Sequence, residues 1–114
     1  MNNIKLQRTN SDILRIVSVT LRDKADSLAL RHVTVLSVET SADFSFARVH
    51  VEITGDERTK AETMAQLERA SGFLRSEISA RVKLRQTPQL RFVLDKGREN
   101  ANRVEELLAQ INNK

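Results

Sequence analysis

Glu68-Arg69-Ala70-Ser71-Gly72-Phe73-Leu74-Arg75-Ser76-Glu77 decides how the two halves of the chain are joined. A helical pattern runs into this stretch and another runs out of it, yet Gly72 stands at its centre. Because a glycine inside a helix costs roughly 1 kcal/mol relative to alanine, a local requirement must outweigh helix propensity there. We therefore predict a bend at Ala70, Ser71 and Gly72.

The apolar residues on both sides of Gly72 form one continuous stripe at helical spacing. They are Met64, Leu67, Ala70, Leu74, Ile78 and Val82. The two halves are therefore either one kinked helix or two helices that share a core face. A second, narrower apolar line follows the glycine and consists of Phe73, Ala80 and Leu84. A change of direction at Gly72 would let both lines be buried.

Strand patterns lie on both sides of this helical region. β-Branched residues favour a strand over 32–40, and strict alternation favours a second over 46–54. Thr87-Pro88 ends the helical region because proline lacks the backbone donor. In order, the predicted elements are a helix over about 5–24, these two strands, the helical region from about residue 58, a strand over 90–94 and a helix over 99–111.

This order of elements predicts one α+β domain over residues 1–114, with helices on one face of a three-stranded sheet. Residues 112–114 are expected to fray. No run approaches the ~18 apolar residues of a membrane span, and the chain does not open with the basic segment and apolar run that are typical of a signal peptide. We therefore expect a cytoplasmic protein.

The chain carries a net charge of +4 and has an isoelectric point of about 10.0, which indicates a polyanionic partner. In the first predicted helix an arginine recurs every seven residues, at Arg8, Arg15 and Arg22, and forms a stripe opposite the apolar face. A second basic group surrounds the bend and consists of Arg69, Arg75, Arg81, Lys83 and Arg85. We predict that both groups contact RNA phosphates. A stripe of this kind is also typical of an ordinary solvated surface.

The small residues at the bend allow two interpretations. Ala70 and Gly72 suit a backbone against which another part of the protein packs closely. A small-residue turn at a helix N-terminus also presents backbone N–H groups to a phosphate. In RNA-binding KH domains, a glycine loop between two helices clamps the backbone of a few nucleotides, and the order of elements here matches a variant of that fold.

The sequence offers little that could catalyse a reaction. There are no cysteines, and His32 and His50 fall in separate predicted strands, where ordinary surface or edge positions are expected. No glycine-rich phosphate loop, metal-binding pattern or glycine-flanked serine is found. We expect no enzymatic activity, no cofactor, no metal and no small-molecule substrate.

Nearly the whole chain resembles the bacterial ribosome-binding factor A family. The resemblance rests on the segments 41–49, 70–75, 84–92 and 95–108. In the second segment, Ala70-Ser71-Gly72 is similar to the family's Ala-x-Gly kink, which stands where KH domains have a Gly-x-x-Gly loop. In the segment Asp23-Lys24-Ala25-Asp26-Ser27-Leu28, the chain departs from the family, because the family's usual proline is missing.

The resemblance implies a KH-like, type II domain that binds the small (30S) ribosomal subunit and 16S rRNA during late maturation and leaves before translation. It further implies a monomeric, non-enzymatic factor of ribosome biogenesis and rRNA processing, often tied to growth in the cold. The rival hypothesis is a small basic protein-interaction module that docks a partner protein through an exposed helix or strand edge.

Overall fold

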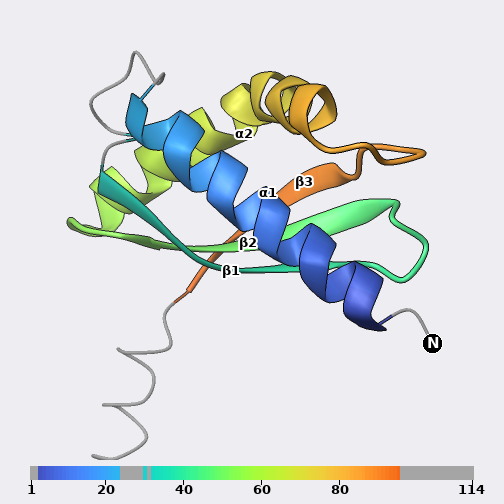
Figure 1. Cartoon of the computed structure of the whole chain (residues 1–114). Helices are drawn as coiled ribbons and strands as arrows, with labels where there is room; N and C mark the ends of the chain where they lie inside the picture. Colours follow the sequence, from blue (N-terminus) through green and yellow to red (C-terminus); the bar gives the residue numbers. More distant parts are fainter. Residues whose placement is uncertain (1–2, 24–29, 31, 96–114) are drawn as a thin grey trace, which may run out of the picture.

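The computed structural model describes residues 3–23, 30 and 32–95 (Figure 1). Its elements are α1 (Asn3–Asp23), β1 (Val33–Thr40), β2 (Phe46–Ile53), α2 (Glu57–Arg81) and β3 (Gln89–Leu94). The predicted strands and the first helix are thus confirmed to within a few residues. The helix expected over 99–111 and most of the connector that departs from the family pattern lie outside the described residues.

The sheet has the order β1-β2-β3 and contains both kinds of strand pairing. β1 and β2 pair antiparallel, from Val33 opposite Ile53 to Thr40 opposite Ala47, with a register shift between Val35 and Ser37. β2 and β3 pair parallel, so the chain must cross the sheet between them. α2 provides this crossover.

Both helices lie on the same side of the sheet (Figure 1). In β2 every second residue is buried, because alternate side chains of a strand point to the same face. The core contains Ala47, Val49, Val51 and Ile53 from β2, Ile13, Ile16, Val17 and Leu21 from α1, Leu67, Leu74 and Ile78 from α2, and Leu90 and Phe92 from β3. The prediction of an α+β domain with helices on one face of a three-stranded sheet is confirmed.

The position of α2 is set by signals at both of its ends. Asp56 caps the N-terminus, since its carboxylate accepts a hydrogen bond of 2.8 Å from the backbone N–H of Thr59. At the other end the backbone N–H of Val82 donates to the carbonyl of Ile78 at 2.8 Å, and the chain then becomes extended. Pro88 is buried just before β3.

Ala70, Ser71 and Gly72 lie inside α2, which is helical without interruption from Glu57 to Arg81. The structure therefore has one helix here and no loop between two helices. The continuous apolar stripe explains this, because Leu67, Leu74 and Ile78 all reach the core only if the helical period is kept across the glycine.

Features that accompany helix bending are nevertheless present beside Gly72. The hydroxyl of Ser71 donates to the carbonyl of Glu68 at 2.8 Å, and the hydroxyl of Ser76 donates to the carbonyl of Gly72 at 3.1 Å. Such bonds from serine to the preceding turn often bend helices. In Figure 1 the ribbon of α2 changes direction along its course.

The surroundings of Gly72 do not fit the interpretation of close packing, and they do not fit the expected burial of the second apolar line. A side chain placed at Gly72 would meet nothing within 4 Å, so no described part of the protein packs closely against this backbone. Phe73 is 49% exposed and Ala80 is exposed, while Leu84 is partly buried, so most of the second apolar line lies at the surface. The apolar stripe on the opposite face of α2 takes the available core contacts, and the helix leaves Phe73 on the solvent side.

Replacing Gly72 with alanine should stabilise the protein by roughly 0.5–1 kcal/mol, because the helix gains an alanine and the added methyl group enters open space. Urea unfolding followed by circular dichroism measures the change. Gly55→Ala is the control with the opposite sign: Gly55 has φ +142°, and a Cβ there would lie 2.8 Å from Thr59 Cγ2. If Gly72→Ala were the destabilising change, the helix would not continue through this position in solution.

Candidate nucleic-acid interface

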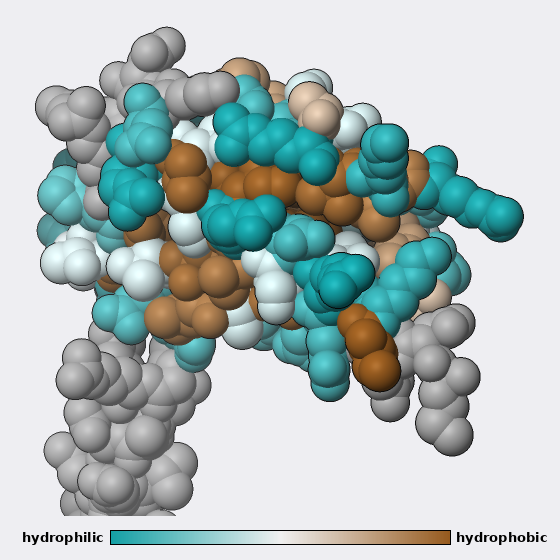
Figure 2. All heavy atoms as spheres, viewed as in Figure 1, coloured by the Kyte–Doolittle hydropathy of each residue, from teal (hydrophilic) through white to brown (hydrophobic). Residues whose placement is uncertain are grey.

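The outer surface of α1 carries an arginine stripe, defined as Arg8, Arg15 and Arg22. All three are exposed, while Ile13, Ile16, Val17 and Leu21 of the same helix are buried. Figure 2 shows a run of hydrophilic side chains along the front of α1, with hydrophobic ones on both sides of it. At a rise of 1.5 Å per residue the stripe extends for about 21 Å, so it could contact several phosphates in succession.

Two residues of the arginine stripe form only long ion pairs with neighbouring aspartates. Arg15 Nη2 lies 3.5 Å from Asp12 Oδ1, and Arg22 Nε lies 3.5 Å from Asp23 Oδ1. The two arginine side chains remain 70% and 74% exposed. Ion pairs of this length and exposure add little stability, so both guanidinium groups are available to another anion.

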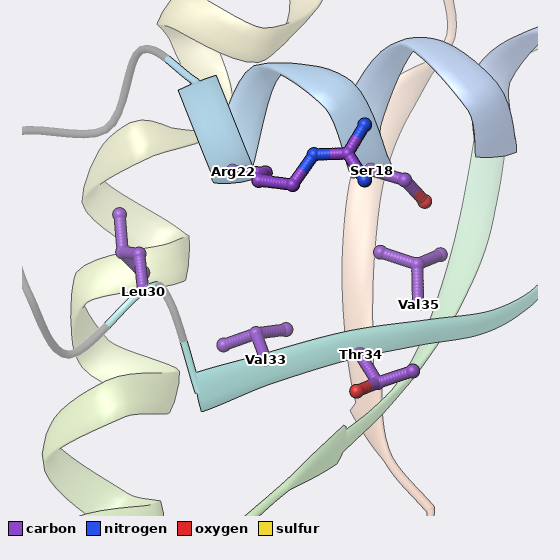
Figure 3. A pocket seen from close by; sticks show the side chains of 6 residues that line it. All are labelled: Ser18, Arg22, Leu30, Val33, Thr34 and Val35. Atoms are coloured by element: carbon purple, nitrogen blue, oxygen red, sulfur yellow. The ribbon is translucent and has the colours of Figure 1, made fainter.

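Arg22 also borders a hollow of about 420 Å³ between α1 and β1. Figure 3 shows its side chain running back along α1 toward Ser18, above Val33 and Val35 of β1. Leu30 completes the apolar part of the lining. The hollow combines an apolar floor with one cationic edge.

The second basic group, around the bend, is dispersed over α2 and the segment that follows it. Arg69 is exposed on α2, and its Nε makes a long contact of 3.4 Å to the carbonyl of Ala65. Arg81 Nη2 lies 3.6 Å from Glu77 Oε2. Lys83 and Arg85 are exposed in the connection to β3. Their role in binding phosphates stays a prediction.

Arg75 differs from the other basic residues because the fold itself uses its guanidinium. Its Nη2 donates to the carbonyl of Thr87 at 2.8 Å, and its Nε donates to the carbonyl of Pro88 at 3.1 Å. The side chain is partly buried in these contacts. Arg75 thereby ties the end of the α2–β3 connection to the middle of α2 and positions the start of β3.

A tight turn between β1 and β2 holds a second hollow, of about 400 Å³. Phe44 adopts a left-handed backbone conformation with φ 61°, which is rare for a bulky residue. Lys5 Nζ lies 5.6 Å from the centre of its ring, and Gln86 Nε2 donates to its carbonyl at 3.2 Å. Arg85 lines the same hollow, so the fold brings one predicted basic residue next to Lys5.

Lys5 and Phe44 were not among the site residues that the sequence predicts. The only local signal was the polar turn sequence beside Phe44, and it does not show that the N-terminus of α1 lies alongside. In the described part of the chain, the contacts of the arginine stripe and those of the basic group around the bend are made to other residues, and not between the two groups.

The turn before β2 is held by Asp43, whose Oδ1 accepts three hydrogen bonds. The donors are the hydroxyl of Ser41 at 2.7 Å, the hydroxyl of Ser45 at 2.7 Å and the backbone N–H of Ser45 at 3.1 Å. These bonds, led by that from the Ser45 hydroxyl, lower the pKa of Asp43 from 3.8 to about 2. Asp43 therefore stays ionised to a lower pH than an ordinary aspartate, and its carboxylate serves as a turn former, the usual role of an aspartate at a strand end.

Neither histidine belongs to a cluster that could hold a metal ion among the described residues. His50 Nε2 lies 2.8 Å from Glu39 Oε1 across the hairpin, and His32 is exposed before β1. Within residues 3–23, 30 and 32–95, no three metal-binding side chains come together. The helices in these ranges are also not apolar enough over a sufficient length to cross a membrane.

The fold and these surfaces define a small basic α+β domain with the element order of KH-like folds. A family model described as Ribosome-binding factor A matches residues 5–108. A Nostoc punctiforme protein named Ribosome-binding factor A is 40% identical over 112 residues, which cover 96% of this chain and 81% of that protein. The chain belongs to the ribosome-binding factor A family.

Solved structures of the same family share the fold. The crystal structure of ribosome-binding factor A from Thermus thermophilus superposes with a TM-score of 0.69 at 25% identity, covering 78% of this chain and 94% of that one. A homology model of the Thermus protein, fitted into the cryo-electron microscopy map of its complex with 30S, gives a TM-score of 0.58 at 25% identity. That comparison covers 74% of this chain and 88% of the other.

Arg75→Met should lower the free energy of unfolding by roughly 1.5–3 kcal/mol, because it leaves the carbonyls of Thr87 and Pro88 without their charged donor. Urea unfolding provides the measurement. Arg69→Met is the matched control on the same helix, and it should change the stability by no more than about 0.5 kcal/mol. Equal effects of the two substitutions would show that Arg75 does not hold the connection.

The Asp43 carboxyl should titrate with a midpoint near pH 2 in the folded protein, measured by NMR of its side-chain carbon. Because the folded pKa lies below the unfolded value, the carboxylate stabilises the turn at neutral pH, and this stabilisation is lost as the pH falls from about 4 to 2. Ser45→Ala should move the midpoint back toward 3.8. A midpoint already near 3.8 in the unmodified protein would contradict the hydrogen-bonded turn.

Proposed function

We propose that this protein is a non-enzymatic, RNA-binding factor that attaches to the small ribosomal subunit during its maturation. The exposed arginine stripe of α1 is the observation that carries the proposal. It presents three guanidinium groups along one helix face, and acids hold two of them only at 3.5 Å. An RNA backbone offers phosphates along the length of such a stripe and releases counterions when they are neutralised.

The comparisons support a ribosomal partner for this surface. The family is described as ribosome-binding factor A, and one structure of similar fold belongs to a protein placed in a complex with 30S. We infer that the chain binds 16S rRNA on the free 30S subunit in late maturation and leaves before translation. On this proposal it works in the cytoplasm as a monomer, takes part in rRNA processing and supports growth in the cold.

The bend region has a narrower role in this proposal. Gly72 is exposed on α2 with open space beside it, so an RNA backbone could approach the helix closely there. Arg69, Arg81, Lys83 and Arg85 would supply the charge around it, because a single glycine inside a helix offers few free backbone N–H groups. Arg75 contributes mainly by holding the connection that carries Lys83 and Arg85.

The rival function is the docking of a partner protein, and exposed apolar side chains favour it. Phe73 is 49% exposed on α2, and Leu36 is 41% exposed on the edge strand β1. A contact of this kind would depend little on salt, whereas phosphate contacts weaken steeply as salt rises. The salt dependence of subunit binding therefore separates the two functions.

Arg15→Glu should weaken binding to purified small subunits several-fold and reduce the slope of log K against log [salt] by about 1. Co-sedimentation in sucrose gradients at several salt concentrations measures both quantities, with immature and mature subunits compared. Arg58→Glu is a matched control: Arg58 is 88% exposed on the other helix, contacts Glu62 at 3.2 Å and belongs to neither basic group. Both variants change the net charge equally.

The triple variant Arg8→Glu/Arg15→Glu/Arg22→Glu should remove most of the binding while the circular dichroism spectrum stays unchanged, because all three side chains are exposed. Subunit affinity equal to that of the unmodified protein would refute the assignment of the arginine stripe. A subunit affinity that does not change with salt concentration in any variant would favour the protein-docking function.

A further inference from the structure

The face of the sheet that points away from the helices carries an arginine pair that belongs to neither of the two basic groups. Arg48 of β2 and Arg91 of β3 are both exposed and stand directly opposite each other in the parallel register. Both belong to the face opposite the buried residues Val49 and Phe92, because side chains alternate along a strand. None of the described elements covers this face.

Two like charges directly opposite each other on neighbouring strands destabilise a sheet. An acidic neighbour could offset this cost. Arg48 lies in the middle strand, and its pairing partner in β1 is Glu39. However, the carboxylate of Glu39 lies 2.8 Å from His50 Nε2, and no ion pair joins it to Arg48. Among the described residues, neither Arg48 nor Arg91 has an acidic partner within ion-pair distance.

The ring of Phe46 holds this pair in place. Arg91 Cζ lies 4.2 Å from the centre of the ring, and Arg48 Cζ lies 5.9 Å from it. A guanidinium over an aromatic face is attracted by the ring and keeps its N–H groups free for an anion. Phe46 thus orients two positive side chains without neutralising them.

A shallow hollow of about 500 Å³ continues from this pair at the end of the sheet. Its lining includes Ser45, Phe46, Gln86 and Arg91. Arg75, Thr87 and Gln89 line the hollow as well. The Ser45 hydroxyl already donates to Asp43, and the Arg75 guanidinium donates to backbone carbonyls. The groups that can donate hydrogen bonds to phosphate oxygens are therefore the Arg91 guanidinium and the side-chain amides of Gln86 and Gln89. The pair and the hollow together, which we name the sheet-face site, form a cationic surface with a polar recess.

We propose that the sheet-face site binds the phosphate backbone of an RNA strand, as a second contact separate from the arginine stripe of α1. Arg48 and Arg91 contact neighbouring phosphates, and Phe46 acts as a positioning residue that holds both guanidinium groups. A phosphodiester chain fits because it repeats its charge along the strand and so matches two adjacent cations. The inference rests on the proposed function, since it takes RNA as the partner.

A contact on this face would place RNA on both sides of the domain. The arginine stripe lies on α1, which packs on one side of the sheet (Figure 1), and the pair Arg48 and Arg91 lies on the other side. One continuous helix of RNA could not easily reach both, so the arrangement fits a protein that is held between two RNA segments. The acidic end of the same face, at Glu52, limits the site to the part of the sheet near Phe46.

The test uses the full chain and purified small subunits. Arg48→Gln/Arg91→Gln should lower the affinity roughly tenfold and reduce the slope of log K against log [salt] by about 1.5. The single variant Arg91→Gln is matched by Arg58→Gln, which removes the same charge from the start of α2 and should leave binding unchanged. Phe46→Leu keeps both charges, so it should weaken binding a few-fold with little change in the slope.

Thermal unfolding checks that these effects are not losses of fold. Because the two arginines repel each other, Arg48→Gln should leave the melting temperature equal or higher. If the double variant failed to fold, the single variant Arg91→Gln would carry the test. A clearly lower melting temperature for every glutamine variant would contradict the inference that Arg48 and Arg91 destabilise the sheet and are available to bind an anion.

A parallel measurement uses protein-free small-subunit rRNA as the probe. The inference requires the double variant to lose affinity for this RNA as well as for intact subunits. A loss confined to intact subunits would assign the site to an acidic protein segment and overturn the proposal. The double variant could bind like the unmodified protein while the triple glutamate variant of the arginine stripe loses affinity. This result would refute the sheet-face site and leave the proposed function supported. If neither variant lost affinity, the sheet-face site and the proposed function would both be refuted.

Discussion

The burial of one face of β2 is the constraint on which the rest of the structure depends. Ala47, Val49 and Val51 are fully buried, and Ile53 is only 3% exposed. β2 is the middle strand, so it pairs antiparallel with β1 and parallel with β3. The parallel pairing requires a crossover, and the apolar face requires a cover. α2 provides the crossover and packs against β3, while α1 packs against β1, so the two helices together cover the apolar face of the sheet (Figure 1).

This arrangement places the basic residues of the chain on different surfaces, where they make different contacts. The arginine stripe of α1 is opposite a buried helix face and is therefore free to contact a partner. Arg75 is fastened to backbone carbonyls and holds the α2–β3 connection in place. Arg48 and Arg91 come from strands that are far apart in sequence and meet only because β3 pairs with β2. The net charge of +4 thus describes neither the number nor the place of the charges available for binding.

The sequence predicted much of the fold because its patterns are local. The alternation in β2 and the helical spacing in α1 both placed their elements within a few residues, and the apolar stripe of α2 was correct across Gly72. The prediction was less successful at Gly72 itself. The small residues allowed close packing as one interpretation, and the second apolar line predicted a buried Phe73, yet the backbone at Gly72 is open and Phe73 is half exposed. Helix continuity outweighed the glycine, because three core residues of α2 depend on it.

The sequence by itself determined the class of fold, the family and the arginine stripe, since periodic patterns and local motifs need no knowledge of distant contacts. Only the tertiary structure decided which basic residues are free. It showed that the guanidinium of Arg75 is bound to the carbonyls of Thr87 and Pro88, and it brought Lys5 to Phe44 and Arg48 to Arg91. The reason is physical: side chains separated by dozens of residues become neighbours through strand pairing and helix packing, which no local pattern records.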